Sequence, residues 1–97
     1  MTSDLDERIC EAIGEELRPL LEAGFVVTSS EYAEEAFGNF YLDLRRGADE
    51  LRITRDRSQY MVRGDEAGLK RAGLWRAFDS KAEFFEALKR YVIEGGE

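Results

Sequence analysis

The feature that most restricts the fold is a pair of segments, residues 41–45 and 50–55, that match when the chain folds back as a hairpin. On one face the matching register places apolar residues opposite each other, and on the other face it places opposite charges across from each other. The four pairs are Leu42/Ile53, Leu44/Leu51, Asp43/Arg52 and Arg45/Glu50. The residues Arg46–Asp49 form the turn, in which Gly47 can adopt a positive φ.

Two more strands are expected beside this hairpin. Residues 25–32 are rich in β-branched and aromatic side chains and predict a first strand, joined to the hairpin by residues 33–38. A turn over residues 56–59 leads into a last strand, residues 60–63, in a register with the pairs Ile53/Val62 and Arg55/Tyr60. The outer face of this sheet is then expected to carry Tyr41, Asp43, Arg45, Arg52, Thr54, Met61 and Arg63, with Thr28 beside them.

Helices are expected at both ends of the chain. Residues 3–23 carry one apolar stripe at helical spacing, made of Leu5, Ile9, Ile13, Leu17, Leu20 and Leu21. Ser3 and Asp6 are a plausible capping pair, Gly24 ends the helix, and Pro19 is expected to kink it or to begin a second short helix.

The C-terminal helix is expected over residues 81–93, between a Ser80/Glu83 capping box and Gly95. Its apolar stripe consists of Phe84, Phe85, Leu88, Tyr91 and Val92. Residues 64–73 read as a polar loop, followed by a short apolar segment, Leu74, Trp75 and Phe78, that is expected to pack in the core.

The resulting order is α-β-β-β-β-α, which defines an α+β fold. We expect residues 1–97 to form a single domain, with a four-stranded antiparallel meander and two helices packed on one face. The other face of the sheet is then either covered by solvent or used as a binding surface.

Composition argues against most catalytic chemistry. The chain has no histidine and one cysteine, Cys10, so His-based catalysis, an internal disulfide and a multi-cysteine metal centre are not expected. Cys10 is interpreted as a semi-buried small apolar residue. We expect a non-enzymatic protein with no cofactor and no metal, located in the cytoplasm because the first residues are acidic and no apolar run is long enough for a membrane span.

The acidity of the chain is concentrated near its beginning. Residues 1–36 hold ten acidic and two basic residues, whereas residues 45–63 hold six arginines and three acids. We name as the acidic ridge the helix residues Asp4, Glu7, Glu11, Glu15 and Glu22, which lie opposite the apolar stripe and which Glu31, Glu34 and Glu35 are expected to extend. The ridge is either a solvated helix face or a surface that attracts a basic protein.

The outer sheet face is the alternative binding surface, through Tyr41, Arg45, Arg52, Met61 and Arg63. It favours either a small ligand held by arginines or a homodimeric chaperone or adaptor that pairs through this face or an edge strand. A nucleic-acid partner is disfavoured because the whole chain has a net charge of −7. We expect a monomer or a weak homodimer, with no membrane contact.

Four short stretches resemble a known group of proteins. They are Ala23-Gly-Phe-Val-Val, Ser30-Glu-Tyr, Phe37-Gly-Asn-Phe-Tyr-Leu and Leu51-Arg-Ile-Thr-Arg-Asp-Arg-Ser-Gln. They are similar to small acidic bacterial proteins of the immunity type, which are encoded beside toxin domains. The resemblance implies a cytoplasmic antitoxin that binds and blocks a co-encoded toxin, and it assigns no active-site residues.

Overall fold

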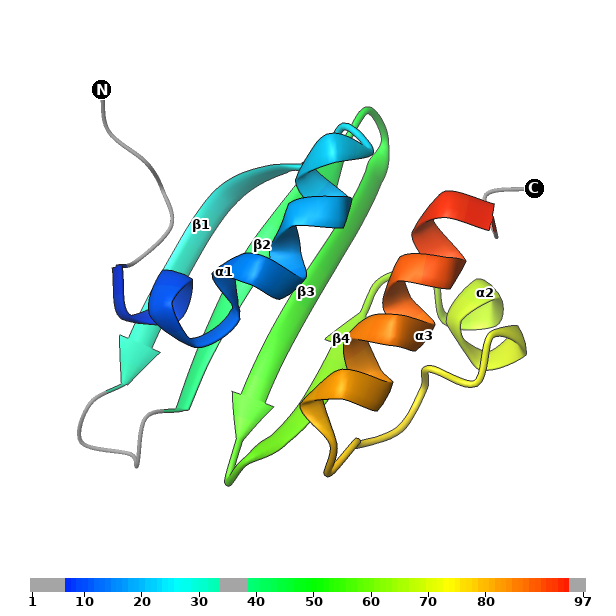
Figure 1. Cartoon of the computed structure of the whole chain (residues 1–97). Coiled ribbons are helices and arrows are strands. Elements are labelled where there is room, and N and C mark those ends of the chain that lie inside the picture. The colour runs from blue at the N-terminus through cyan, green and yellow to red at the C-terminus, as the bar shows by residue number, and fades with distance from the viewer. Residues whose placement is uncertain (1–6, 34–38, 95–97) are drawn as a thin grey trace.

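The chain folds as an α+β domain, in the order expected from the sequence with one helix added (Figure 1). The structure is a computed structural model that describes residues 7–33 and 39–94. The elements are α1 (Glu7–Glu22), β1 (Val26–Ala33), β2 (Asn39–Arg46), β3 (Asp49–Asp56), β4 (Gln59–Arg63), α2 (Glu66–Arg71) and α3 (Lys81–Glu94). The Ser3/Asp6 cap, Leu5 and Gly95 lie outside the described residues.

The four strands form one antiparallel sheet in the order β1-β2-β3-β4. Every predicted pair of the central hairpin is present, and so are the Ile53/Val62 and Arg55/Tyr60 pairs of the second hairpin. The register between β1 and β2 shifts between Val27 and Ser29, so that Thr28 is the extra residue of a β-bulge.

The two hairpin turns reach positive φ with different residues. Gly47 has φ 61°, as the sequence predicts, whereas Arg57 (φ 55°) and Ser58 (φ 68°) occupy the left-handed region without a glycine. Asn39 supports this second turn, because its Oδ1 accepts from the Arg57 backbone N–H at 2.9 Å and its Nδ2 donates to Asp56 at 3.1 Å. These hydrogen bonds offset part of the cost of two non-glycine residues at positive φ.

Helices α1 and α3 lie side by side on one face of the sheet, which is the predicted two-layer arrangement (Figure 1). The buried side chains of both helices and the inward residues of the strands form one core between the two layers, and Tyr91 of the predicted α3 stripe is partly buried beside it. At the α3 side the core is aromatic, with the Tyr60 ring centroid 5.6 Å from that of Phe84 and 5.8 Å from that of Phe85. None of the helices in residues 7–33 and 39–94 lies on the opposite face of the sheet, and we call it the open sheet face.

Helix α1 differs from the prediction in two respects. Its irregularity lies at Ile13 (φ −136°, ψ 17°) and not at Pro19, and the Ala23 backbone N–H still donates to the Pro19 carbonyl at 3.0 Å. Leu21 is 42% exposed, because Ile13, Leu17 and Leu20 already form the buried stripe and Leu21 lies about 100° further around the helix.

The predicted polar loop over residues 64–73 contains helix α2 instead. The Asp65 carboxylate accepts from the Gly68 backbone N–H at 3.2 Å and caps its first turn, and Leu69 is completely buried. Trp75 is 38% exposed, so its predicted core position is wrong, whereas its neighbours Leu74 and Phe78 are buried.

Helix α3 agrees with the prediction, since the Glu83 backbone N–H donates to Ser80 Oγ at 3.2 Å at its start. None of the helices described here combines the length and apolar character needed to cross a membrane.

Candidate protein-binding surfaces

The described part of the acidic ridge is exposed along α1. Glu7, Glu11, Glu15 and Glu22 all have exposed side chains, while Asp4 lies outside the described residues. Glu15 forms an ion pair with Arg18 at 3.4 Å, and both side chains are well exposed, so the pair is weak. The other three form no ion pair with any residue in the described ranges, and the ridge therefore keeps most of its negative charge.

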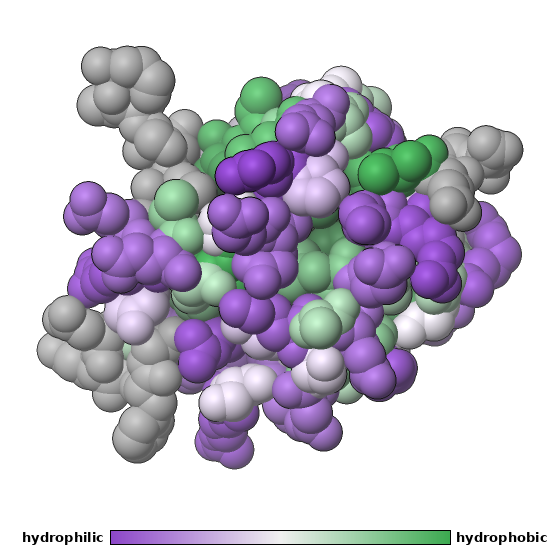
Figure 2. Space-filling model, viewed as in Figure 1, coloured by the Kyte–Doolittle hydropathy of each residue, from purple (hydrophilic) through white to green (hydrophobic). Residues whose placement is uncertain are grey.

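One glutamate of α1, Glu16, contacts α3 and does not belong to the acidic ridge. Glu16 is oriented toward α3, where Lys81 Nζ lies 3.4 Å from its carboxylate and also donates to the Ala12 carbonyl at 3.0 Å. Figure 2 looks onto this helix side and shows mainly hydrophilic side chains over α1 and α3. The ridge is therefore the solvent-facing surface of a helix that α3 and the sheet hold in place.

The structure does not bring Glu31 to the acidic ridge. Glu31 pairs with Tyr41 across β1 and β2, and its carboxylate accepts from the Tyr41 hydroxyl at 3.3 Å on the open sheet face. The acidic ridge and Glu31 therefore lie on opposite sides of the sheet. Glu34 and Glu35 lie outside the described residues.

The open sheet face holds all five residues of the alternative surface: Tyr41, Arg45, Arg52, Met61 and Arg63. Its centre is a compact group in which Arg52 donates to both carboxylate oxygens of Asp43, at 2.7 and 3.0 Å, and lies 4.2 Å from the centroid of the Tyr41 ring. Since Arg52 is already paired and stacked, it is poorly suited to capture a free anion.

The same group changes the ionisation of Asp43. The hydrogen bond from Arg52 lowers the pKa of the Asp43 carboxyl below its usual 3.8, partial burial opposes this, and the charge of Arg52 and a hydrogen bond from Ser29 add to the lowering. Asp43 is therefore a fixed negative charge at neutral pH. The neighbouring Arg63, directly across from Arg52 in the register, forms no ion pair with any other described residue.

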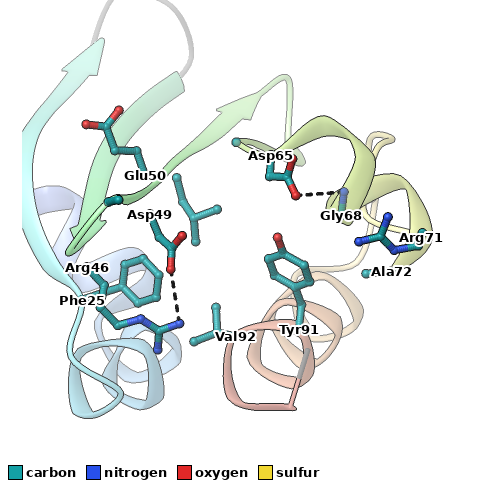
Figure 3. A pocket seen from close by; sticks show the side chains of 13 residues that line it. Phe25, Arg46, Asp49, Glu50, Asp65, Gly68, Arg71, Ala72, Tyr91 and Val92 are labelled. Atoms are coloured by element: carbon teal, nitrogen blue, oxygen red, sulfur yellow. Dashed lines mark hydrogen bonds and ion pairs between the residues drawn. The ribbon is translucent and has the colours of Figure 1, made fainter. Parts of the chain in front are cut away.

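A cleft that the sequence does not reveal lies where the β2–β3 turn, α2 and α3 meet (Figure 3). Its volume is about 770 Å³, and the Tyr91 hydroxyl points into it from α3. Burial raises the pKa of Tyr91 above 10.0, and the negative charges of Asp65 and Asp49 raise it further while Arg71 opposes them. Helix α2 forms one wall of the cleft. Because the sequence predicts a loop over residues 64–73, it does not predict the cleft.

Cys10 is exposed, contrary to the prediction of a semi-buried residue, because it lies on the solvent side of α1 next to the buried Ile9. In the part of the chain that the structure describes, no three His, Cys, Asp or Glu side chains are grouped to hold a metal ion. Comparison with protein-family models, with curated proteins and with solved structures finds no match to this chain.

Proposed function

We propose that the protein is a non-enzymatic protein-binding module that uses the acidic ridge of α1 to bind and block a basic protein, such as a co-encoded toxin. The observation that carries the proposal is the run of exposed glutamates on one helix, of which only Glu15 is paired with another described residue. A surface of one charge attracts a partner of the opposite charge over a distance of about 8 Å at physiological salt.

The shape of the ridge favours a protein over a small ligand. Glu7, Glu11 and Glu22 stand on the convex outer side of α1, whereas small molecules are usually held in concave sites. Electrostatic complementarity between two protein surfaces raises the association rate and selects the partner. The resemblance to immunity-type proteins supports the same proposal, and a cytoplasmic location suits the exposed thiol of Cys10.

The test is affinity capture from the native host with the wild-type protein and two charge-reversed variants. The ridge variant is Glu7→Lys/Glu11→Lys/Glu22→Lys, and the matched control, with the same charge change elsewhere, is Glu66→Lys/Glu83→Lys/Glu86→Lys. We expect a basic protein that is retained by the wild type and the control, lost by the ridge variant, and eluted by about 0.5 M salt.

The purified partner then allows a quantitative measurement. We expect its dissociation constant to rise at least tenfold between about 50 and 300 mM salt, and again with the ridge variant. A captured protein that binds the ridge variant as tightly as the wild type would refute the use of this surface. Capture of an acidic protein whose binding does not depend on salt would refute the proposed function.

A further inference from the structure

The open sheet face has an unusual composition for the outside of an acidic protein. Its charges are nearly balanced, since three arginines (Arg45, Arg52 and Arg63) accompany the carboxylates of Glu31, Asp43 and Glu50, with Asp56 at the end of β3. It contains no lysine, because the three lysines of the chain, Lys70, Lys81 and Lys89, all belong to α2 and α3. Protein interfaces are rich in arginine, tyrosine and methionine and poor in lysine, aspartate and glutamate, so the arginines, Tyr41 and Met61 fit an interface and the carboxylates fit it only where they are paired.

One row of this face is partly withdrawn from solvent although none of the described elements covers it. Tyr41, Thr54 and Met61 follow one another across β2, β3 and β4, and each is half-buried. At the β1 edge Val26 is 58% exposed. The face therefore offers a half-buried row, Tyr41, Thr54 and Met61, beside the charged group of Asp43 and Arg52, in a molecule whose remaining surface carries most of the excess negative charge.

The charges are arranged so that this face is complementary to itself. Consider two copies packed face to face around a two-fold axis that runs parallel to the strands, between β2 and β3. Each outward residue of β2 then faces a β3 residue of the other copy. That β3 residue has the same number as the one it pairs with across the strands of its own chain. The facing pairs are Tyr41 with Thr54, Asp43 with Arg52, and Arg45 with Glu50, each formed twice.

The same operation brings β4 of one copy opposite β1 of the other. Arg63 then faces Ser29 of the second copy. Within that second copy the Ser29 hydroxyl donates to the Asp43 carboxylate at 3.4 Å, so Asp43 lies beside the facing serine. Arg63, which has no ion-pair partner among the described residues of its own chain, would gain a carboxylate. A two-fold axis perpendicular to the strands, at the level of Arg52, would instead place Arg52 on Arg52, which the like charges disfavour. The axis parallel to the strands also brings Arg63 near a carboxylate, and we adopt it.

We propose that the open sheet face binds a second copy of this chain, giving a two-fold dimer in which the two sheets pack as the layers of a β-sandwich. Sheets packed in this aligned manner lie about 10 Å apart and within about 30° of parallel, which keeps the facing pairs in reach of each other. The inference is independent of the proposed function, because the acidic ridge lies on the helix side and stays exposed in the dimer.

The size of the face sets the expected strength. Four strands spaced about 4.8 Å apart, each about 20 Å long, give a footprint of roughly 400 Å² on each copy. This is at or below the low end of stable interfaces, so we expect a reversible dimer with a dissociation constant between about 10 µM and 1 mM. The ridges of the two copies lie on the outer sides of the dimer, where salt screens their repulsion.

The experiment is sedimentation velocity from about 5 to 500 µM with charge-reversed variants of one facing pair. The wild type is expected to shift from monomer to dimer over this range. Arg45→Glu leaves two acids facing each other and Glu50→Arg leaves two arginines, so each variant alone is expected to stay monomeric. A 1:1 mixture of the two variants is expected to form a heterodimer, and the double variant Arg45→Glu/Glu50→Arg is expected to dimerise like the wild type.

The matched control reverses an exposed Arg–Glu pair of similar geometry on α3, Arg90 and Glu86, whose ion-pair distance is 3.6 Å. Arg90→Glu and Glu86→Arg are expected to dimerise like the wild type. A wild type that stays monomeric at 500 µM overturns the proposal, and so does a dimer that survives both single reversals or that the control variants also abolish. A monomer whose Tyr41 and Met61 resonances respond to a hexaglutamate peptide would show an acidic partner instead and would equally overturn it.

Discussion

The two hairpin turns allow the free-energy cost of a positive φ at a non-glycine residue to be measured in this protein. Ser58 has φ 68° in the second turn, whereas the corresponding residue of the first turn, Ala48, is not among the non-glycine residues at positive φ. The left-handed conformation costs a residue with a Cβ about 1–2 kcal/mol. Glycine removes this cost but loses about 0.5–1 kcal/mol more in conformational entropy on folding. Ser58→Gly is therefore expected to stabilise the protein by about 0.5–1 kcal/mol.

The assay is thermal and urea unfolding, followed by circular dichroism. In a domain of this size about 0.5–1 kcal/mol corresponds to an increase of roughly 2–8 °C in Tm. Ala48→Gly is the matched control: it adds the same entropy cost without relieving any strain, so it is expected to lower Tm. Gly47→Ala is expected to lower it as well, and since a Cβ at Gly47 would meet no atom within 4 Å, that loss would report only the φ of 61°.

If Ser58→Gly lowered Tm as much as Ala48→Gly, the assignment of strain to the second turn would be refuted. The result would instead favour the hydrogen bonds that Asn39 accepts from Arg57 and donates to Asp56 as what defines the turn.

Three other predictions follow from the core and from the shifted pKa values of Asp43 and Tyr91. Leu69→Ala is expected to destabilise the protein by about 2–4 kcal/mol in urea unfolding, because this completely buried side chain anchors α2; no loss would mean that α2 does not fold onto the core. The Asp43/Arg52 hydrogen bonds are expected to stabilise the fold above pH 3.8 and to lose this effect as the pH falls below it, so Asp43→Asn should lower stability at pH 7 and much less at pH 3. Absorbance at 295 nm, compared with Tyr91→Phe, is expected to show Tyr91 ionising above pH 10.0, and the stability gained from its neutral phenol should hold below pH 10.0 and disappear as the pH rises further.

The central hairpin could be predicted from the sequence because both of its faces restrict the register. A shift of one residue would expose Leu42 and Leu44 and would also separate the charged pairs of the other face. The kink of α1 could not be predicted in this way. Proline is the usual reason for a kink, but the Pro19 position continues as helix and the distortion lies beside Gly14, at Ile13.

Helix α2 was hidden because it has only six residues and contains Gly68. A single apolar residue, Leu69, gives no periodicity, and glycine is a poor helix former. Its signal is the cap: Asp65 accepts from the backbone N–H three residues later, and a Cβ at Gly68 would lie 2.6 Å from that carboxylate. Since α2 could not be predicted, the cleft that it lines beside Tyr91 could not be predicted either.

The bulge at Thr28 decides which side of the sheet Glu31 occupies. Side chains alternate between the two faces of a strand, so with Val27 packed on the core, an unbroken β1 would place Glu31 on the helix side and Tyr32 on the open face. The extra residue reverses this order. Tyr32 instead packs under α1, with Arg8 4.5 Å above its ring, and Glu31 joins Tyr41 on the open face. One inserted residue thus divides the acids that the sequence suggested were one surface.

The arginine-rich hairpins do not form a basic patch, although the sequence gives them a surplus of positive charge. Arg46 stacks on Phe25 at 4.5 Å and donates to the Ala23 carbonyl, and Arg55 lies over Phe40, so both are held at the ends or the inner side of the sheet. What remains on the open face is balanced by carboxylates. The negative charge on the helix side is not balanced in this way. A basic partner is therefore proposed to bind the helix side, and a second copy of the chain is proposed to bind the nearly neutral, self-complementary open face.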